Sequence, residues 1–89
     1  MRKPSLNINS LAIIRSFGED VFSALKDLRA REQFTIIMRY GLSRQEPRTY
    51  KDIAAALGIS IARVQNIERS GLSKLRHLSD RRIEHAESR

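Results

Sequence analysis

The chain has 89 residues, of which 17 are Lys or Arg and 10 are Asp or Glu, so its formal net charge is +7. This length allows one small domain with one core, and the charge is typical of a protein that meets phosphates, although an acidic protein or a membrane surface would suit it equally. Because the chain has no cysteine, disulfides and thiolate metal ligands are excluded and a reducing compartment is favoured. The sequence has no apolar run near the ~20 residues of a membrane span and no signal-peptide pattern, so we expect a cytoplasmic protein.

The first eighteen residues carry Pro4, three serines, two asparagines and Gly18, with one short apolar patch at residues 11–14. Such a composition is typical of a loose terminus. We therefore expect residues 1–18 to form a flexible or adapter segment that becomes ordered on a partner.

Four helices are predicted from residue 19 onward, so the expected fold class is all-α. The first begins at Glu19 and Asp20, whose carboxylates suit the positive end of a helix dipole. Its apolar residues recur at helical intervals and are Val21, Phe22, Leu25 and Leu28. The second helix covers residues 30–40 and ends at Gly41, a residue suited to a left-handed helix end. A polar surface loop is expected at residues 43–48.

The stretch YKDIAAALGISIARVQNIER, residues 50–69, has the pattern of two helices that cross at a tight turn. Its apolar positions are Ile53, Leu57, Ile59, Val64 and Ile67. Ala54 is the small residue where the helices touch, Gly58 lies at the turn, and Thr49 and Ser60 are the predicted caps. The pattern predicts a helix-turn-helix, whose second helix typically lies in the DNA major groove. That helix continues to about Leu78, and Gly71 within it predicts a bend or close packing.

The order of these pieces resembles region 4 of the sigma-70 family, the C-terminal promoter-binding domain of bacterial sigma factors, and is most similar to the primary-type members. The matching segments are LRAREQFTIIMRYGL, EPRT, the helix-turn-helix and VQNIERSGLSKLRHLSD. The resemblance covers about residues 20–80 and divides the chain into a segment at 1–18, a domain at 19–80 and a charged tail at 81–89. It implies a bacterial or phage-infected bacterial cell, binding to the upstream promoter hexamer, and docking on the flap of the RNA polymerase β subunit.

The resemblance also implies roles for particular residues. Arg31, Arg39 and Thr49 match DNA-backbone contacts, and residues 60–66 match the groove-facing start of the recognition helix. The predicted DNA-binding set is Arg31, Arg39, Thr49, Ser60, Ile61, Ala62, Arg63, Gln65, Asn66 and Arg69. Arginines and helix N-termini bind phosphate on physical grounds as well. The arginines also allow a plainer interpretation, in which Arg31 forms a solvated ion pair with Glu32 and the stem of Arg39 covers apolar surface.

The recognition helix departs from the family where bases are read. Primary sigma factors place an Arg-Glu pair just after the cap, whereas this chain has Ile61 and Ala62, which cannot form side-chain hydrogen bonds. Asn66 stands where the family has a base-reading glutamine. Because Asn pairs bidentately with adenine and Ile61 suits a thymine methyl group, we expect a target that is richer in A·T or less strictly defined than the usual hexamer.

A second departure lies on the helix at residues 30–40. Phe34 and Ile37, often polar or basic in the family, are apolar and lie three residues apart, beside Ile36 and Tyr40. A helix that is apolar over much of its circumference is either deeply buried or offers a partner surface. The candidate partners are the polymerase flap and an anti-sigma-like protein that captures sigma domains.

Three function classes follow, led by a promoter-binding initiation module. A complete sigma factor also needs a domain that melts the promoter, so this chain is either one domain of a longer factor or a stand-alone regulator, which Met1 favours. The alternatives are an interaction protein with little sequence-specific DNA binding, and a repressor or activator that binds as a dimer. His77 and His85 have no clustered ligands, so we expect no metal, no cofactor and no enzyme activity.

Overall fold

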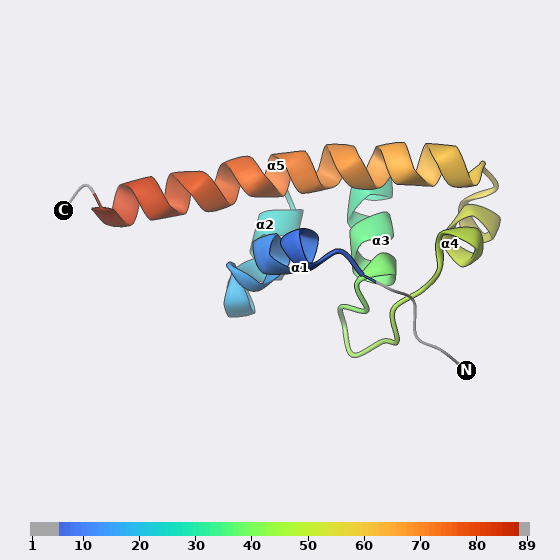
Figure 1. Cartoon of the computed structure of the whole chain (residues 1–89), viewed down its shortest axis with the longest axis horizontal. Helices are drawn as coiled ribbons and strands as arrows, with labels where there is room; N and C mark the ends of the chain where they lie inside the picture. Colours follow the sequence, from blue (N-terminus) through green and yellow to red (C-terminus); the bar gives the residue numbers. More distant parts are fainter. Residues whose placement is uncertain (1–5, 88–89) are drawn as a thin grey trace.

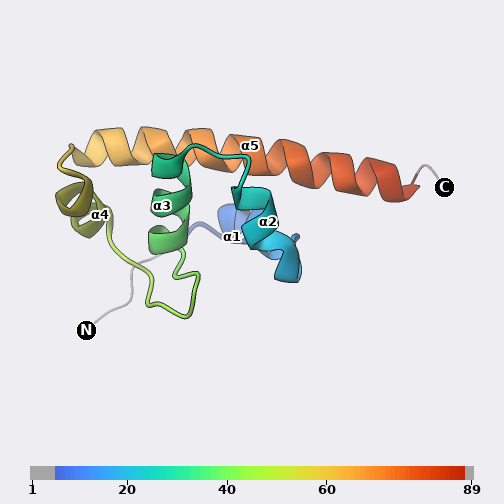
Figure 2. The same ribbon diagram turned by 180° about the vertical axis from the view of Figure 1, so that it is seen from behind.

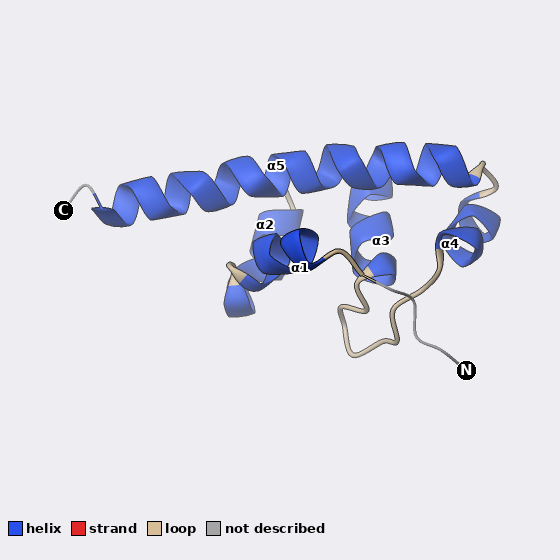
Figure 3. Cartoon of the chain, in the orientation of Figure 1, coloured by secondary structure: helices blue, strands red, loops and turns tan. Residues whose placement is uncertain are grey.

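The computed structural model describes the backbone of residues 6–87 and the side chains of residues 6–81. This part of the chain is helical and contains no strand (Figures 1 and 3). The helices are α1 (Ile8–Arg15), the 3-10 turn η1 (Gly18–Asp20), α2 (Val21–Leu25), α3 (Ala30–Arg39), α4 (Tyr50–Leu57) and α5 (Ile61–Glu87). The all-α fold class is therefore confirmed, and residues 6–87 form five α-helices in place of the four predicted.

Helix α5 forms the spine of the molecule. It is 27 residues long, and α1 to α4 all lie along one side of it, as the views from front and back agree (Figures 1 and 2). The larger core cluster joins α1, α2, α3 and the middle of α5 and consists of Ile14, Phe17, Val21, Leu25, Leu28, Ile36, Tyr40 and Leu75. A smaller cluster joins α4 to the start of α5 and consists of Ile53, Ala54 and Val64.

Gly71 lies where α5 crosses α3. A Cβ atom at this position would lie 3.3 Å from Cγ1 of Ile36 and 3.4 Å from Cβ of Glu32. The absence of a side chain thus brings the two helix backbones close together, and the predicted close packing at Gly71 is confirmed.

Residues 6–18, expected to form a flexible or adapter segment, are largely helical and pack against the rest of the chain. Asn7 caps α1, because its Oδ1 accepts hydrogen bonds from the backbone N–H of Asn9 at 2.8 Å and of Ser10 at 3.2 Å. Ile14 and Phe17 are buried in the larger core at 5% and 3% exposure. Apolar burial orders this segment within the chain itself. Residues 1–5 lie outside the described part of the structure.

The other helices differ from the predictions at their ends. The first predicted helix, from residue 19, is divided into η1 and α2, yet Val21, Leu25 and Leu28 are buried as their spacing predicts, while Phe22 is 44% exposed. Helix α5 continues to Glu87, so the predicted tail at 81–89 begins inside it. Within the described residues no helix is long and apolar enough to cross a membrane, and no group of three metal-ligating side chains gathers.

Candidate nucleic-acid interface

The turn between α4 and α5 has the geometry of a helix-turn-helix. Gly58 has φ of +68°, the left-handed conformation that glycine adopts without strain, and the N–H of Ile59 donates to the carbonyl of Ala54 at 3.1 Å. Helix α4 therefore ends abruptly. Ser60 then caps α5, because its Oγ accepts from the N–H of Arg63 at 3.1 Å.

The smaller core cluster fixes which face of α5 remains exposed. Val64 is fully buried against Ile53 and Ala54 of α4, so the cap and the residues of the first turns of α5 that do not pack against α4 point outward. Those that are exposed are Ser60, Ile61, Ala62, Arg63, Gln65, Asn66 and Arg69. We call these seven residues the reading face. The side chain of Ile61 is apolar and 45% exposed at the very start of the helix.

A basic groove of about 230 Å³ runs beside the reading face. Arg29 and Arg31, from the start of α3, line it together with Arg63 and Asn66 of α5. The structure thus brings Arg31 next to two members of the reading face. Arg29 was missed by the sequence reasoning, although its position two residues before Arg31 at a helix start was a signal for it.

Glu32 is the acidic residue of this groove, and its charge is already satisfied. Its carboxylate accepts from Ser70 Oγ at 2.6 Å, from Lys74 Nζ at 2.8 Å and from the N–H of Arg29 at 2.9 Å. Burial alone raises the pKa of Glu32, but these hydrogen bonds and the Lys74 charge outweigh it and lower the pKa to about 2. The carboxylate pairs with Lys74 rather than with Arg31, so the groove keeps its positive character.

Arg39, a predicted DNA contact, is buried, and this argues against the prediction. Arg39 is only 7% exposed, its Nη1 donates to the carbonyl of Arg48 at 3.0 Å, and its guanidinium lies 3.9 Å from the centre of the Tyr50 ring. This geometry is a cation–π contact that joins α3 to the start of α4. The plainer interpretation expected the stem of Arg39 to cover apolar surface with its head group in water, but the guanidinium is enclosed as well.

A buried carboxylate extends this contact to α5. Glu68, which is 7% exposed, accepts hydrogen bonds from the Tyr40 hydroxyl at 2.6 Å and from the Tyr50 hydroxyl at 2.7 Å. Burial, and after it the hydrogen bond to Glu68, raises the pKa of both tyrosines. The network ties α3, α4 and α5 together beneath the reading face and so holds the recognition helix in place.

Thr49 is exposed at the start of α4, where its Oγ1 accepts from the N–H of Asp52 at 3.1 Å. The predicted cap is therefore confirmed. A hydroxyl that accepts one hydrogen bond can still donate another, so this position remains compatible with a phosphate contact.

Comparison with known proteins identifies the domain. Residues 24–77 match the family described as Sigma-70, region 4. The chain belongs to this family. It is 38% identical over 68 residues to an RNA polymerase sigma-C factor of a Nostoc species, an alignment that covers 76% of this chain and 16% of that protein. It is 32% identical over 88 residues to an RNA polymerase sigma-28 factor of Bacillus thuringiensis subsp. kurstaki, covering 84% of this chain and 37% of that protein.

The chain thus spans well under half the length of either relative. No solved structure matches it. Sigma-70 region 4 is a DNA-binding domain of transcription factors and not an enzyme, so the sequence-based assignment to a DNA-binding transcription module is confirmed at this level.

The two residues predicted to offer one partner surface on this region 4 domain are divided between the two cores. Ile37 is half-buried against the larger cluster, whereas Phe34 is half-buried against the smaller one. Phe34 and Met38 also line an apolar groove of about 190 Å³ between α3 and α4. Phe34 thus faces a hollow to which a partner has access.

Proposed function

We propose that this sigma region 4 domain binds the upstream element of a bacterial promoter and docks on RNA polymerase at the β flap, in the cytoplasm. In this proposal the first turns of α5 enter the major groove, where a recognition helix reads base edges. Arg31, and with it Arg29, then binds backbone phosphates from the neighbouring groove, which fixes the orientation of the protein on the duplex.

The observation that carries the proposal is the placement of the arginines beside the reading face. Arg29 and Arg31 share a groove with Arg63 and Asn66, and its carboxylate, Glu32, is neutralised by Lys74. The positions proposed to read bases and those proposed to bind phosphates thus lie side by side on one surface. A duplex contacted by the reading face would bring its backbone to these arginines.

The chemistry of the reading face favours a target different from the family hexamer. Ile61 offers only apolar contact, which suits a thymine methyl group, and Ala62 offers no hydrogen bond. Asn66 accepts from Arg69 Nη1 at 3.1 Å through its Oδ1, which leaves its NH₂ group as a donor and one lone pair as an acceptor for adenine. We therefore propose an element that is A·T-rich at these positions.

The test is a binding titration of the full chain with labelled duplexes that carry the usual hexamer, an A·T-rich version of it, and a randomised sequence, each at two salt concentrations. We expect the A·T-rich duplex to bind most tightly. Arg31→Ala should weaken all three duplexes alike and reduce the slope of log K against log salt by about 1, because a phosphate contact carries no sequence information. Lys26→Ala, which removes an exposed charge that does not line the groove, is the matched control.

A gain-of-specificity variant sharpens this test. Ile61→Arg combined with Ala62→Glu supplies the hydrogen-bonding pair of the primary sigma factors and should shift preference toward the usual hexamer by about 1–3 kcal/mol for each base pair that is read. Binding of the wild type to the usual hexamer with undiminished preference would refute the A·T-rich target. Equal, weak binding to all duplexes would refute sequence-specific promoter recognition.

A second candidate function is polymerase docking with little sequence-specific DNA binding. The apolar groove at Phe34 and Met38 favours it, because a small domain that leaves such a groove open offers a site for an apolar partner segment. A pull-down with the purified β-flap domain tests it, with Phe34→Asp as the disruptive variant. Flap binding that Phe34→Asp abolishes, together with sequence-blind DNA binding, would establish this function in place of promoter recognition.

A further inference from the structure

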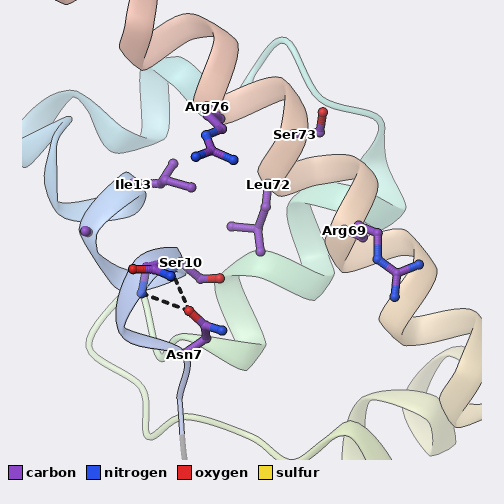
Figure 4. A pocket seen from close by; sticks show the side chains of 9 residues that line it. Asn7, Ser10, Ile13, Arg69, Leu72, Ser73 and Arg76 are labelled. Carbon is purple, nitrogen blue, oxygen red and sulfur yellow. Dashed lines mark hydrogen bonds between the residues drawn. The ribbon is translucent and has the colours of Figure 1, made fainter.

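The guanidinium of Arg69 is turned toward the reading face. Arg69 borders a groove of about 470 Å³ between α1 and the middle of α5, but its side chain points away from that groove (Figure 4). Its Nη1 donates a hydrogen bond to Oδ1 of Asn66 at 3.1 Å, three residues earlier on α5. Arg69 is thus joined to the residue that is proposed to read adenine.

This hydrogen bond decides which way the amide of Asn66 faces. An asparagine amide has an acceptor, Oδ1, on one side and a donor, Nδ2, on the other, and rotation about one bond exchanges them. A guanidinium has N–H donors and no acceptor, so Arg69 can hold only the oxygen side of the amide. Oδ1 therefore faces Arg69, and Nδ2 lies on the opposite side. The bond selects one of the two orientations.

The selected orientation still presents both amide groups to a base. A carbonyl oxygen has two lone pairs, so Oδ1 can accept from Arg69 and from a base at the same time. Adenine offers N7 as an acceptor and its N6 amino group as a donor in the major groove, which match Nδ2 and Oδ1 of an asparagine. Because Asn66 is exposed on the reading face, its amide is arranged for adenine before DNA arrives.

An amide held in one orientation distinguishes an A·T pair from the inverted T·A pair. Inversion reverses the order of donor and acceptor across the major groove. An amide that is free to turn over can follow this reversal, whereas an amide held by Arg69 follows it only if their hydrogen bond breaks. A side chain that is already held also loses less conformational entropy on binding. The bond therefore favours one direction of reading.

We infer that Arg69 is a positioning residue, which holds the amide of Asn66 in the orientation that reads A·T in preference to T·A. This inference rests on the proposed function, in which Asn66 reads adenine. Arg69 contributes to base preference through Asn66 and not through a phosphate contact of its own. This role differs from the direct DNA contact that the sequence predicts for Arg69.

The first test measures the amide in the chain without DNA. Side-chain NMR relaxation gives the order parameter of the Asn66 NH₂ group, which reports its fast motion. We expect a high value in the wild type, a lower value in Arg69→Leu, and recovery in Arg69→Lys, because an ammonium also has donors only. Circular dichroism spectra confirm that each variant is folded. Equal order parameters in the wild type and Arg69→Leu would overturn the inference.

The second test measures base preference in binding titrations of the full chain. Each A·T pair of the A·T-rich duplex is inverted in turn, and the pair that Asn66 reads is the one whose inversion weakens the wild type but not Asn66→Ala. At that pair, Arg69→Leu should lower the preference for A·T over T·A at least about threefold, and Arg69→Lys should restore most of it. Lys26→Leu removes an exposed positive charge just after α2 and should leave the preference unchanged.

A double-mutant cycle separates this role from a phosphate contact. In the Asn66→Ala background, Arg69→Leu should have no further effect on the preference, because the group that it positions is gone. If Arg69→Leu instead weakens every duplex alike and lowers the slope of log K against log salt by about 1, Arg69 binds a phosphate and the inference is overturned.

The outcomes also distinguish this inference from the proposed function. If the wild type prefers A·T at the pair that Asn66 reads and Arg69→Leu keeps that preference, the inference fails and the proposed function stands. If no inversion affects the wild type, the proposed adenine reading fails and the role of Arg69 in base preference fails with it. A held amide would then be only a hydrogen bond on the helix surface.

Discussion

The carboxylate of Glu68 holds α3, α4 and α5 together. The stability lost when this carboxylate is removed measures its contribution. Glu68→Leu leaves the hydroxyls of Tyr40 and Tyr50 without their acceptor. A hydrogen bond to a charged group contributes about 1.5–3 kcal/mol, and Tyr50 is only half-buried, so water replaces part of its loss. We expect the free energy of unfolding to fall by about 3 kcal/mol, which lowers Tm by about 12–24 °C in a domain of this size.

Urea and thermal unfolding followed by far-UV circular dichroism give this free energy. Glu68→Gln keeps a carbonyl acceptor but loses the charge, so about half of the effect should remain. Adding Tyr40→Phe and Tyr50→Phe to Glu68→Leu should recover much of the stability, because neither tyrosine hydroxyl is then left without its acceptor. The reasoning is refuted if Glu68→Leu costs less than about 1 kcal/mol, or if the two Phe substitutions add to its cost.

The same network predicts the response to alkaline pH. Burial and the hydrogen bonds to Glu68 raise the pKa of Tyr40 and Tyr50 above their ordinary value of 10.0. Groups whose pKa is raised in the folded state contribute stability that is fully present below pH 10 and is lost as pH rises through the raised values. The wild type should therefore lose stability above pH 10, and Glu68→Leu should show a shallower loss in urea titrations.

Two further predictions concern the contact between α3 and α5. Because the pKa of Glu32 is lowered from 4.5 to about 2, this carboxylate contributes to the free energy of unfolding above pH 4.5, and the contribution is lost as pH falls toward 2. Lys74 is 42% exposed and screened by water, so we expect the free energy of unfolding to fall by about 1–2 kcal/mol over this pH range. In urea titrations, Glu32→Gln should remove this acid dependence. An unchanged slope of stability against pH in that variant would contradict the prediction. Gly71→Leu should lower the free energy of unfolding by about 2–3 kcal/mol or more, because the side chain would collide with Ile36. Gly71→Ala should change it by less than about 1 kcal/mol, because the higher helix propensity of alanine offsets the tight contact. Identical thermal melts of the Leu and Ala variants would exclude close packing at this site.

Part of the candidate site was predictable because its signals are local. Thr49, Ser60 and Gly58 act through neighbours within a few residues, so cap and turn chemistry appears directly in the sequence. The exposure of Asn66 follows from helical periodicity once Val64 is assigned to the core, whereas Ile61 lies three residues before Val64 and is exposed because it begins the helix. The assignment of these residues to DNA contact remains a prediction.

Arg39 shows where local reasoning ends. Its position resembles a phosphate contact, but the carbonyl of Arg48 and the ring of Tyr50 enclose it from a second helix and a loop. Glu32 is a similar case, because its partner Lys74 is 42 residues away in the sequence and not the adjacent Arg31. Such pairings depend on how helices meet in space, which side-chain type and spacing along one helix do not specify.

The sequence by itself determined the all-α class, the helix-turn-helix and the reading face, because helical period, caps and turn glycines act over a few residues. Only the tertiary structure decided that residues 6–18 belong to the core. Ile14 and Phe17 are apolar, but they become buried only when α2 and α5 pack over them. It also decided that Arg29 joins the basic groove and that a further, larger groove lies between α1 and α5. Grooves arise from the crossing of helices distant in the chain, so their chemistry becomes visible only once those helices are packed.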